Sequence, residues 1–188
     1  MDFELKYQLP VFVEFFCRYK FPDDKSHYNA NVAFTYYTYA YHQLITYTET
    51  YVSLFKMSNP SNDEVLYISR KAWSYALSMY VMLRVALEAL QHMRNMLGDK
   101  GQVIDSVQGV IDIANEVAKH PAFNSNQDSS AREPWSISVN GEFDIITWAE
   151  DGTSSILATR RPEGDFMIIH DYMESMAQKF LKEQKISA

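Results

Sequence analysis

The chain has 188 residues, of which 47% are hydrophobic and 22% charged, so it is long enough for one domain with a buried core and too apolar for extended disorder. Its formal net charge of -7 disfavours broad attraction to the phosphates of nucleic acids and leaves only a local basic patch for such contact. A single cysteine excludes an internal disulfide, no window reaches the ~20 apolar residues of a membrane span, and the acidic start lacks a signal-peptide pattern. We therefore expect a cytoplasmic protein without membrane contact.

Apolar residues recur three and four positions apart through most of the first 119 residues, which predicts a series of helices. Ser61 and Glu64 form a capping box at the start of one of them, and Gly98 is placed to end it. The predicted helices are a short one that starts at Pro10 and longer ones over residues 29–56, 61–97 and 102–119. Tyr and Thr favour strand over residues 29–56 by propensity, but the three-four spacing runs too long for a single strand.

The two longest predicted helices each carry one continuous apolar side. These sides consist of Ala33, Tyr37, Ala40, Leu44, Tyr47, Tyr51 and Leu54 in the first, and of Leu66, Trp73, Ala76, Tyr80, Leu83, Leu87, Leu90 and Leu97 in the second. Because only a short turn joins them, the two helices should pack antiparallel as a hairpin.

The spacing pattern changes in the last third of the chain. Alternating runs on either side of Asn140 and Gly141 predict a β-hairpin, since both residues tolerate positive φ. Further strands are predicted over residues 155–159 and 166–169. Asp171 with Glu174 then predicts the start of a last helix.

Together these elements predict a mainly α protein that forms a single domain over residues 1–188. We expect a long antiparallel helical hairpin in a bundle of four to five helices, with a small antiparallel β-hairpin appendage of two or three strands before the C-terminal helix. The predicted parts are the helical bundle (1–122), a loop (123–134), the β appendage (135–169) and the C-terminal helix (170–186).

Two sets of residues at helical spacing carry side chains capable of proton transfer or metal binding. Asp112, Glu116 and His120 are four residues apart, so one helical face would hold two carboxylates and an imidazole. The more economical interpretation is a solvated face with a histidine near the helix C-terminus. His170 and Glu174 are also four residues apart, which predicts a salt link at the start of the last helix.

Four arginines carry charges that need an acidic neighbour, a ligand or solvent. Arg94 falls on the apolar side of its helix, so its guanidinium should meet either a carboxylate in a structural ion pair or a ligand phosphate; the ion pair is favoured. Arg84 has Glu88 four residues on, which predicts a surface ion pair. Arg160 and Arg161 are adjacent in a predicted solvated turn, where the nearby acidic residues should neutralise them.

A long helical hairpin, a following helix that ends in "AKHP" (His120 and Pro121) and a small β segment resemble bacterial members of the HEPN superfamily over residues 30–122. The resemblance implies a helical domain from a defence or toxin-antitoxin context, and in active members a ribonuclease that uses an arginine and a histidine with four to six residues between them. This chain has Ile113, Ala114 and Asn115 where that arginine should be. Asn115 cannot supply a permanent cation to a phosphate.

The function that these observations favour is a cytosolic, non-catalytic interaction or regulatory module, which we interpret as a degenerate HEPN-like domain. It should form a homo-oligomer or bind a protein partner through its Tyr-rich helix, without cofactor or metal. The alternative is a metal-independent HEPN-like ribonuclease in which His120 acts with Asn115 and a displaced arginine such as Arg94.

Overall fold

The structure, a computed structural model, describes residues 8–101, 103–119, 132–137, 142–148 and 154–187. Within these residues the chain forms five helices and three strands. They are α2 (Pro10–Arg18), α3 (Asp24–Lys56), α4 (Asn62–Met96), α5 (Asp105–Lys119), β1 (Arg132–Ile137), β2 (Phe143–Trp148), β3 (Ser154–Arg160) and α6 (Pro162–Ser187). The prediction of a mainly helical bundle is confirmed.

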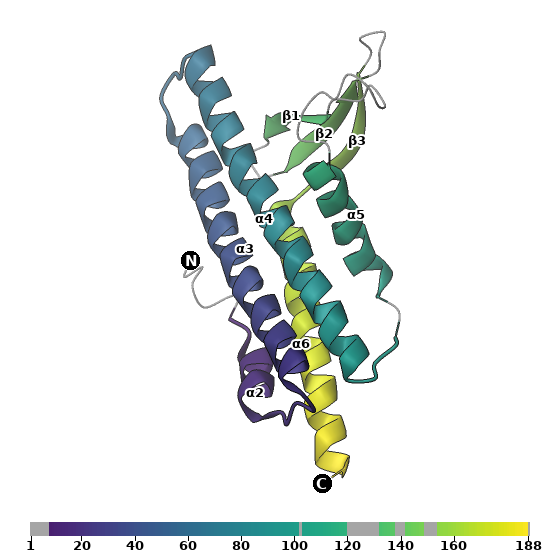
Figure 1. Cartoon of the computed structure of the whole chain (residues 1–188). Coiled ribbons are helices and arrows are strands. Elements are labelled where there is room, and N and C mark those ends of the chain that lie inside the picture. The colour runs from purple at the N-terminus through teal and green to yellow at the C-terminus, as the bar shows by residue number, and fades with distance from the viewer. Residues whose placement is uncertain (1–7, 102, 120–131, 138–141, 149–153, 188) are drawn as a thin grey trace.

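The helices α3 and α4 form the predicted antiparallel hairpin and run side by side for most of the length of the molecule (Figure 1). With 33 and 35 residues, each is about 50 Å long. Asp23 caps α3, because its carboxylate accepts a hydrogen bond of 2.7 Å from the backbone N–H of Ser26. Ser61 and Glu64 form the predicted capping box of α4, and Gly98 follows its end with a φ of 82°.

The seam between α3 and α4 consists largely of small and medium-sized residues, which let the two backbones approach closely. Fully buried alanines lie on both sides of it, and the larger side chains fill the space between them. The buried residues of the two helices are Ser26, Ala30, Ala33, Tyr37, Ala40, Leu44 and Tyr47 in α3, and Ala72, Ala76, Met79, Tyr80, Leu83, Ala86, Leu87, Ala89, Leu90, Met93 and Arg94 in α4. Leu66, which we predicted on the inward side of α4, is exposed.

The remaining helices cover one side of this hairpin (Figure 1). α5 packs against α4, α6 contacts both hairpin helices, and α2 docks on α6. Buried aromatic side chains hold α2 in place: Phe15 contacts the rings of Phe12, Tyr19, Phe21 and Phe180 with centroids 4.9 to 5.9 Å apart. In the described part of the chain, no helix combines the length and the apolar character needed to cross a bilayer.

The last helix begins at Pro162 and not at residue 170 as we predicted, and the strand predicted over residues 166–169 is wrong. Pro162 occupies the first helical position, where its fixed φ is favourable, and Glu163 and Asp165 supply the acidic first turn. Two of the predicted strand residues, Phe166 and Ile169, begin a helical stripe of buried side chains that continues with Met173, Met176, Ala177 and Phe180.

Three antiparallel strands in the order β1-β2-β3 form a small sheet between α5 and α6 in the sequence. β1 lies near α4, and the sheet sits at the end of the bundle where α4 begins (Figure 1). β1 starts at Arg132, inside the predicted loop 123–134, and tolerates Pro134 because it is an edge strand. The predicted turn at Asn140 and Gly141 lies outside the described residues.

Candidate functional site

Arg94 lies near the C-terminal end of α4 with only 5% of its surface exposed, and partners within the protein surround its guanidinium. Its Nε donates to Asp99 Oδ2 at 2.9 Å, and its Nη2 donates to the backbone carbonyl of Gly101 at 3.0 Å. Its Nη1 donates to Gln91 Oε1 at 3.3 Å and to the hydroxyl of Tyr172. Arg94 therefore forms a structural ion pair, one of the two interpretations of its position in the sequence.

Asp99 connects this arginine to the last helix. Its Oδ2 also lies 3.2 Å from the Nζ of Lys179 in α6, and its Oδ1 accepts a hydrogen bond of 3.0 Å from the backbone N–H of Gly101. The hydrogen bond from Arg94, helped by those from Gly101 and Lys179, lowers the pKa of Asp99 to about 2 although burial opposes the shift. The charge on Asp99 thus stabilises the contact between the end of α4 and α6.

Replacing Asp99 with asparagine should destabilise the protein by roughly 2 kcal/mol near neutral pH, since its pKa falls from 3.8 to about 2 on folding. A depressed pKa contributes stability above the unfolded value of 3.8, and the contribution disappears as the pH falls toward about 2. Urea unfolding of wild type and Asp99→Asn over this pH range measures the difference. The two curves should converge in acid, and a difference that does not change with pH would contradict this assignment.

The candidate ribonuclease residues are not brought together in the described part of the chain. α5 runs back along α4 from the end where Arg94 lies (Figure 1). Asn115 is half-buried and lies ten residues after Asp105, the start of α5, which corresponds to roughly 15 Å along the helix. His120 lies outside the described residues. Arg94 therefore sits at the opposite end of α5 from the helix terminus that precedes His120.

The predicted acidic stripe on α5 is only partly described. Asp112 is exposed, and its Oδ1 accepts a hydrogen bond of 2.8 Å from the Nε2 of Gln108. The side chains of Glu116 and His120 are outside the described part. Among the described residues, no three His, Cys, Asp or Glu side chains are grouped so that they could hold a metal ion.

A second charged cluster joins the sheet to the bundle. Arg160, at the end of β3, donates from Nε to Asp165 Oδ2 at 3.0 Å and from Nη2 to Asp165 Oδ1, while the hydroxyl of Tyr80 donates to the same carboxylate. Burial raises the pKa of Asp165, although the hydrogen bond from Tyr80 and the charge of Arg160 oppose the shift. The prediction of a solvated turn is wrong for Arg160, because the side chains of Arg160 and Asp165 are only 22% and 8% exposed.

His170 and Glu174 lie within α6 and not at its start, and each contacts another helix. The Nδ1 of His170 lies 2.8 Å from the hydroxyl oxygen of Tyr37 in α3. The carboxylate of Glu174 accepts hydrogen bonds from the backbone N–H groups of Val11 at 3.0 Å and Phe12 at 3.3 Å. Glu174 therefore caps the first turn of α2, whose own N-cap residue, Leu9, provides no side-chain cap.

Large apolar side chains are exposed at the end where α3 turns into α4. We call this surface the hairpin tip and define it by Phe55, Val65, Leu66 and Tyr67, each more than a third exposed. Figure 1 shows that this end of the hairpin projects beyond the first residues of α6. The tip is therefore the part of the hairpin that α6 does not cover.

The Tyr-rich helix α3 uses its tyrosines in different ways. Tyr37 and Tyr47 are buried, Tyr37 beside Phe166 and His170 of α6, and Tyr28 and Tyr39 are exposed. Desolvation on burial raises the pKa of Tyr47 well above its usual value. The buried tyrosines stabilise the monomer, so they are not available to a partner.

Comparison with known proteins identifies no relative: no family model, no curated protein and no solved structure matches this chain.

Sequence reasoning missed the hairpin tip, although a signal for it exists. Val65, Leu66 and Tyr67 are three consecutive apolar residues directly after the capping box. Successive residues in a helix point about 100° apart, so the three cannot all face one neighbouring helix. Such a run in the first turns of a helix predicts exposed apolar surface.

Proposed function

We propose that this chain is a non-catalytic interaction module that self-associates through the hairpin tip. The observation that carries the proposal is the concentration of four large exposed apolar side chains at one end of the hairpin. Contiguous exposed apolar surface rimmed by polar residues is typical of protein contact sites. The proposal places the contact at the tip and not along the whole Tyr-rich helix, because Tyr37 and Tyr47 are buried in the monomer.

The charges around the tip favour a second copy of the chain as the partner. Lys56 and Asp63 flank the tip, and both are exposed. Within the described residues neither of them forms an ion pair. A two-fold axis through the tip would bring each Lys56 toward Asp63 of the other copy, as a self-complementary contact requires. The small size of the tip predicts a weak, concentration-dependent dimer.

We also propose that the helical part is an inactive HEPN-like domain that carries the sheet as an appendage. The hairpin followed by α5 supports this proposal, and so does Asn115 in place of the expected arginine. The contacts of Arg94 weigh against the ribonuclease alternative, because its guanidinium already donates to Asp99, Gly101, Gln91 and Tyr172. A guanidinium so occupied would lose these bonds if it moved to a phosphate.

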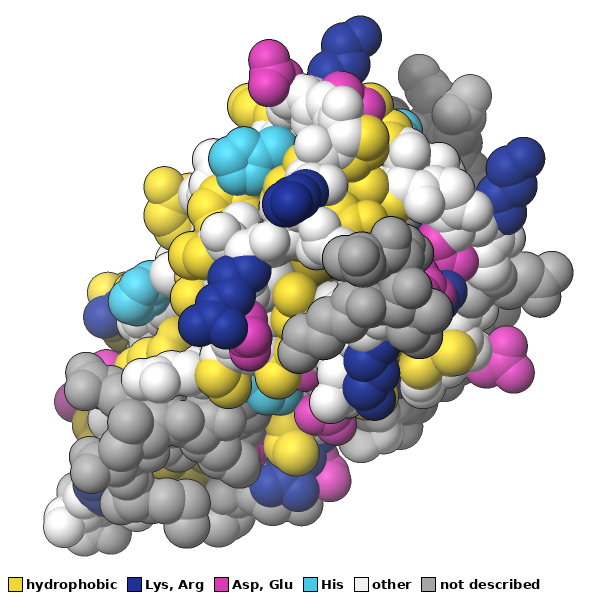
Figure 2. Space-filling model, turned by 90° about the horizontal axis from the view of Figure 1, so that it is seen from below, with side chains coloured by type: hydrophobic (Ala, Val, Ile, Leu, Met, Phe, Trp, Pro, Cys, Tyr) yellow, Lys and Arg dark blue, Asp and Glu magenta, His cyan; other side chains and the backbone are white. Residues whose placement is uncertain are grey.

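The distribution of charge also favours a protein partner over a nucleic acid. On the end of the bundle opposite the tip, basic and acidic side chains are interspersed (Figure 2). With a net charge of -7, the chain has little electrostatic attraction for a phosphate backbone on such a face.

Tyr67→Lys should weaken self-association at least about tenfold, because it places a charge within the apolar contact. The introduced lysine lies four residues after Asp63 on α4, so the helix itself should tolerate it. Sedimentation equilibrium from low-micromolar to near-millimolar concentration measures the dissociation constant.

Tyr28→Lys provides a matched control at the opposite end of the hairpin. Tyr28 and Tyr67 are the same residue type and are 66% and 67% exposed, so the two variants remove equivalent surface at different places. Tyr28→Lys should associate like the wild type. Equal weakening in both variants, or a wild type that stays monomeric throughout, would contradict the role of the tip. Cleavage of mixed RNA that is lost in His120→Ala would contradict the non-catalytic assignment.

A further inference from the structure

A cavity of about 470 Å³ lies between α4 and α5, away from the hairpin tip. Its volume falls within the roughly 300–1,000 Å³ of sites that enclose small organic ligands. Its floor is apolar: Val107 is fully buried, and Leu87, Ile111 and the ring of Tyr172 lie beside it. Clefts between the helices of a bundle are common ligand sites.

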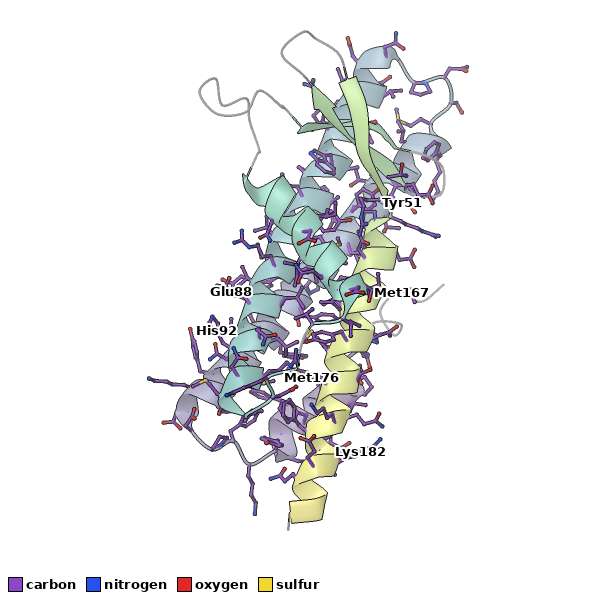
Figure 3. All side chains as sticks on the ribbon, turned by 90° about the vertical axis from the view of Figure 1, so that its right-hand side faces the viewer. Tyr51, Glu88, His92, Met167, Met176 and Lys182 are labelled. Atoms are coloured by element: carbon purple, nitrogen blue, oxygen red, sulfur yellow. The ribbon has the colours of Figure 1, made fainter. Side chains whose placement is uncertain are left out.

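The rim of this cavity is polar and comes mostly from one face of α4. Its polar residues are Arg84, Glu88, Gln91, His92, Asn95 and Gln108. Figure 3 shows Glu88 and His92 projecting from the later part of α4, near the level at which α5 begins. Three members of the rim are already engaged. Gln91 donates to Asn95 at 2.9 Å and accepts from Arg94, and Gln108 donates to Asp112 at 2.8 Å.

Arg84 is a charged member of the rim that has no partner among the residues that the structure describes. Its spacing from Glu88 predicts an ion pair, but in the described part of the chain Arg84 has no carboxylate within 4.0 Å and no hydrogen bond. Arg84 is half-buried, whereas Glu88 is exposed and can be solvated by water. A partly desolvated guanidinium is stabilised by an anion that shares its site.

We propose that the cavity between α4 and α5 binds a small amphipathic monocarboxylate, with its apolar body on Val107 and Ile111 and its carboxylate on Arg84. One arginine neutralises a single negative charge. Glu88 and the exposed Asp112 would repel a second, so the geometry favours a monocarboxylate over a dianionic phosphate. This site goes beyond the proposed function and does not depend on the hairpin tip.

The test uses three probes that share one apolar body: 4-phenylbutyrate, 4-phenylbutan-1-ol and 4-phenylbutylamine. Calorimetric titration of the full chain should show the carboxylate binding about tenfold more tightly than the alcohol, and the amine more weakly than both. In spectra of methyl-labelled protein, Val107 and Ile111 should shift on titration. A chain that binds none of the three probes, or that binds the amine as well as the carboxylate, overturns the proposal.

Variants separate the contribution of the Arg84 charge to carboxylate affinity from the contribution of the apolar cavity. Arg84→Gln should reduce binding of the carboxylate to the level of the alcohol, while Arg70→Gln, an exposed arginine earlier on α4, should leave it unchanged. Glu88→Gln should tighten carboxylate binding two- to threefold, because it removes a repulsive neighbour. This gain cannot come from misfolding. Unchanged carboxylate affinity in both Arg84→Gln and Glu88→Gln would show that Arg84 does not hold the anion and would overturn the proposal.

Discussion

Replacement of Asp165 by alanine is expected to lower the free energy of unfolding by about 3 kcal/mol or more. The change removes the acceptor of three hydrogen bonds at once, two from Arg160 and one from Tyr80. The buried Tyr80 hydroxyl would lose this acceptor, and Arg160 would keep a charge that is only 22% exposed. Urea unfolding followed by circular dichroism gives the free-energy difference.

Two controls distinguish the stability contributed by the buried cluster from that of the exposed Arg161 beside it. Arg161→Ala should change stability by less than about 0.5 kcal/mol, because Arg161 is 54% exposed and lies 3.7 Å from Glu163. The double variant Tyr80→Phe with Asp165→Ala should lose less free energy of unfolding than the two single variants lose in sum. The reason is that each single change removes the same hydrogen bond. Strict additivity would show that Tyr80 and Asp165 do not interact in solution.

Phe15→Ala should destabilise the protein by about 3–5 kcal/mol, the usual cost of a deleted aromatic core side chain. Phe15 is fully buried at the centre of the aromatic cluster that docks α2 on α6. Its removal leaves a cavity beside the rings of its four aromatic neighbours, which cannot easily move to fill it. Chemical denaturation measures the loss, and hydrogen exchange should show faster opening of the α2 amides.

Phe16→Ala is the matched comparison, because it removes the same side chain from the next position of the same helix. Phe16 is only partly buried and stacks on the exposed His27 with centroids 4.8 Å apart. Phe16→Ala should lower the free energy of unfolding by less than half as much as Phe15→Ala. Equal losses would show that general helix destabilisation, and not docking on α6, controls the stability of α2.

The helical hairpin could be predicted from the sequence because its signals are local. The capping box at Ser61, the glycine at position 98 and the three-four spacing each act within one or two helical turns. The start of α6 was missed because the local signal there points to the wrong structure. Phe166–Ile169 has strand-like residue types, and the helical register becomes visible only when Pro162 is taken as the first helical residue.

The charged clusters were harder to predict because their partners are set by tertiary packing. The sequence shows that Arg94 needs a partner, but Tyr172 and Lys179 reach the cluster only because α6 packs beside the end of α4. The burial of Asp165 gives no local signal either, because Tyr80, its buried donor, lies 85 residues away. Among the candidate ribonuclease residues, local spacing gave no information on where Arg94 lies relative to Asn115.

The cap that Glu174 places on α2 links the beginning of the chain to its end. The hairpin of α3 and α4 is built from contacts between neighbouring segments, whereas α2 needs acceptor atoms and ring contacts from residues about 160 positions later. During synthesis α2 leaves the ribosome well before its docking site on α6, so Phe12 and Phe15 stay exposed until α6 has been made. The nascent chain therefore offers a binding segment for chaperones, and a product truncated before α6 would keep it.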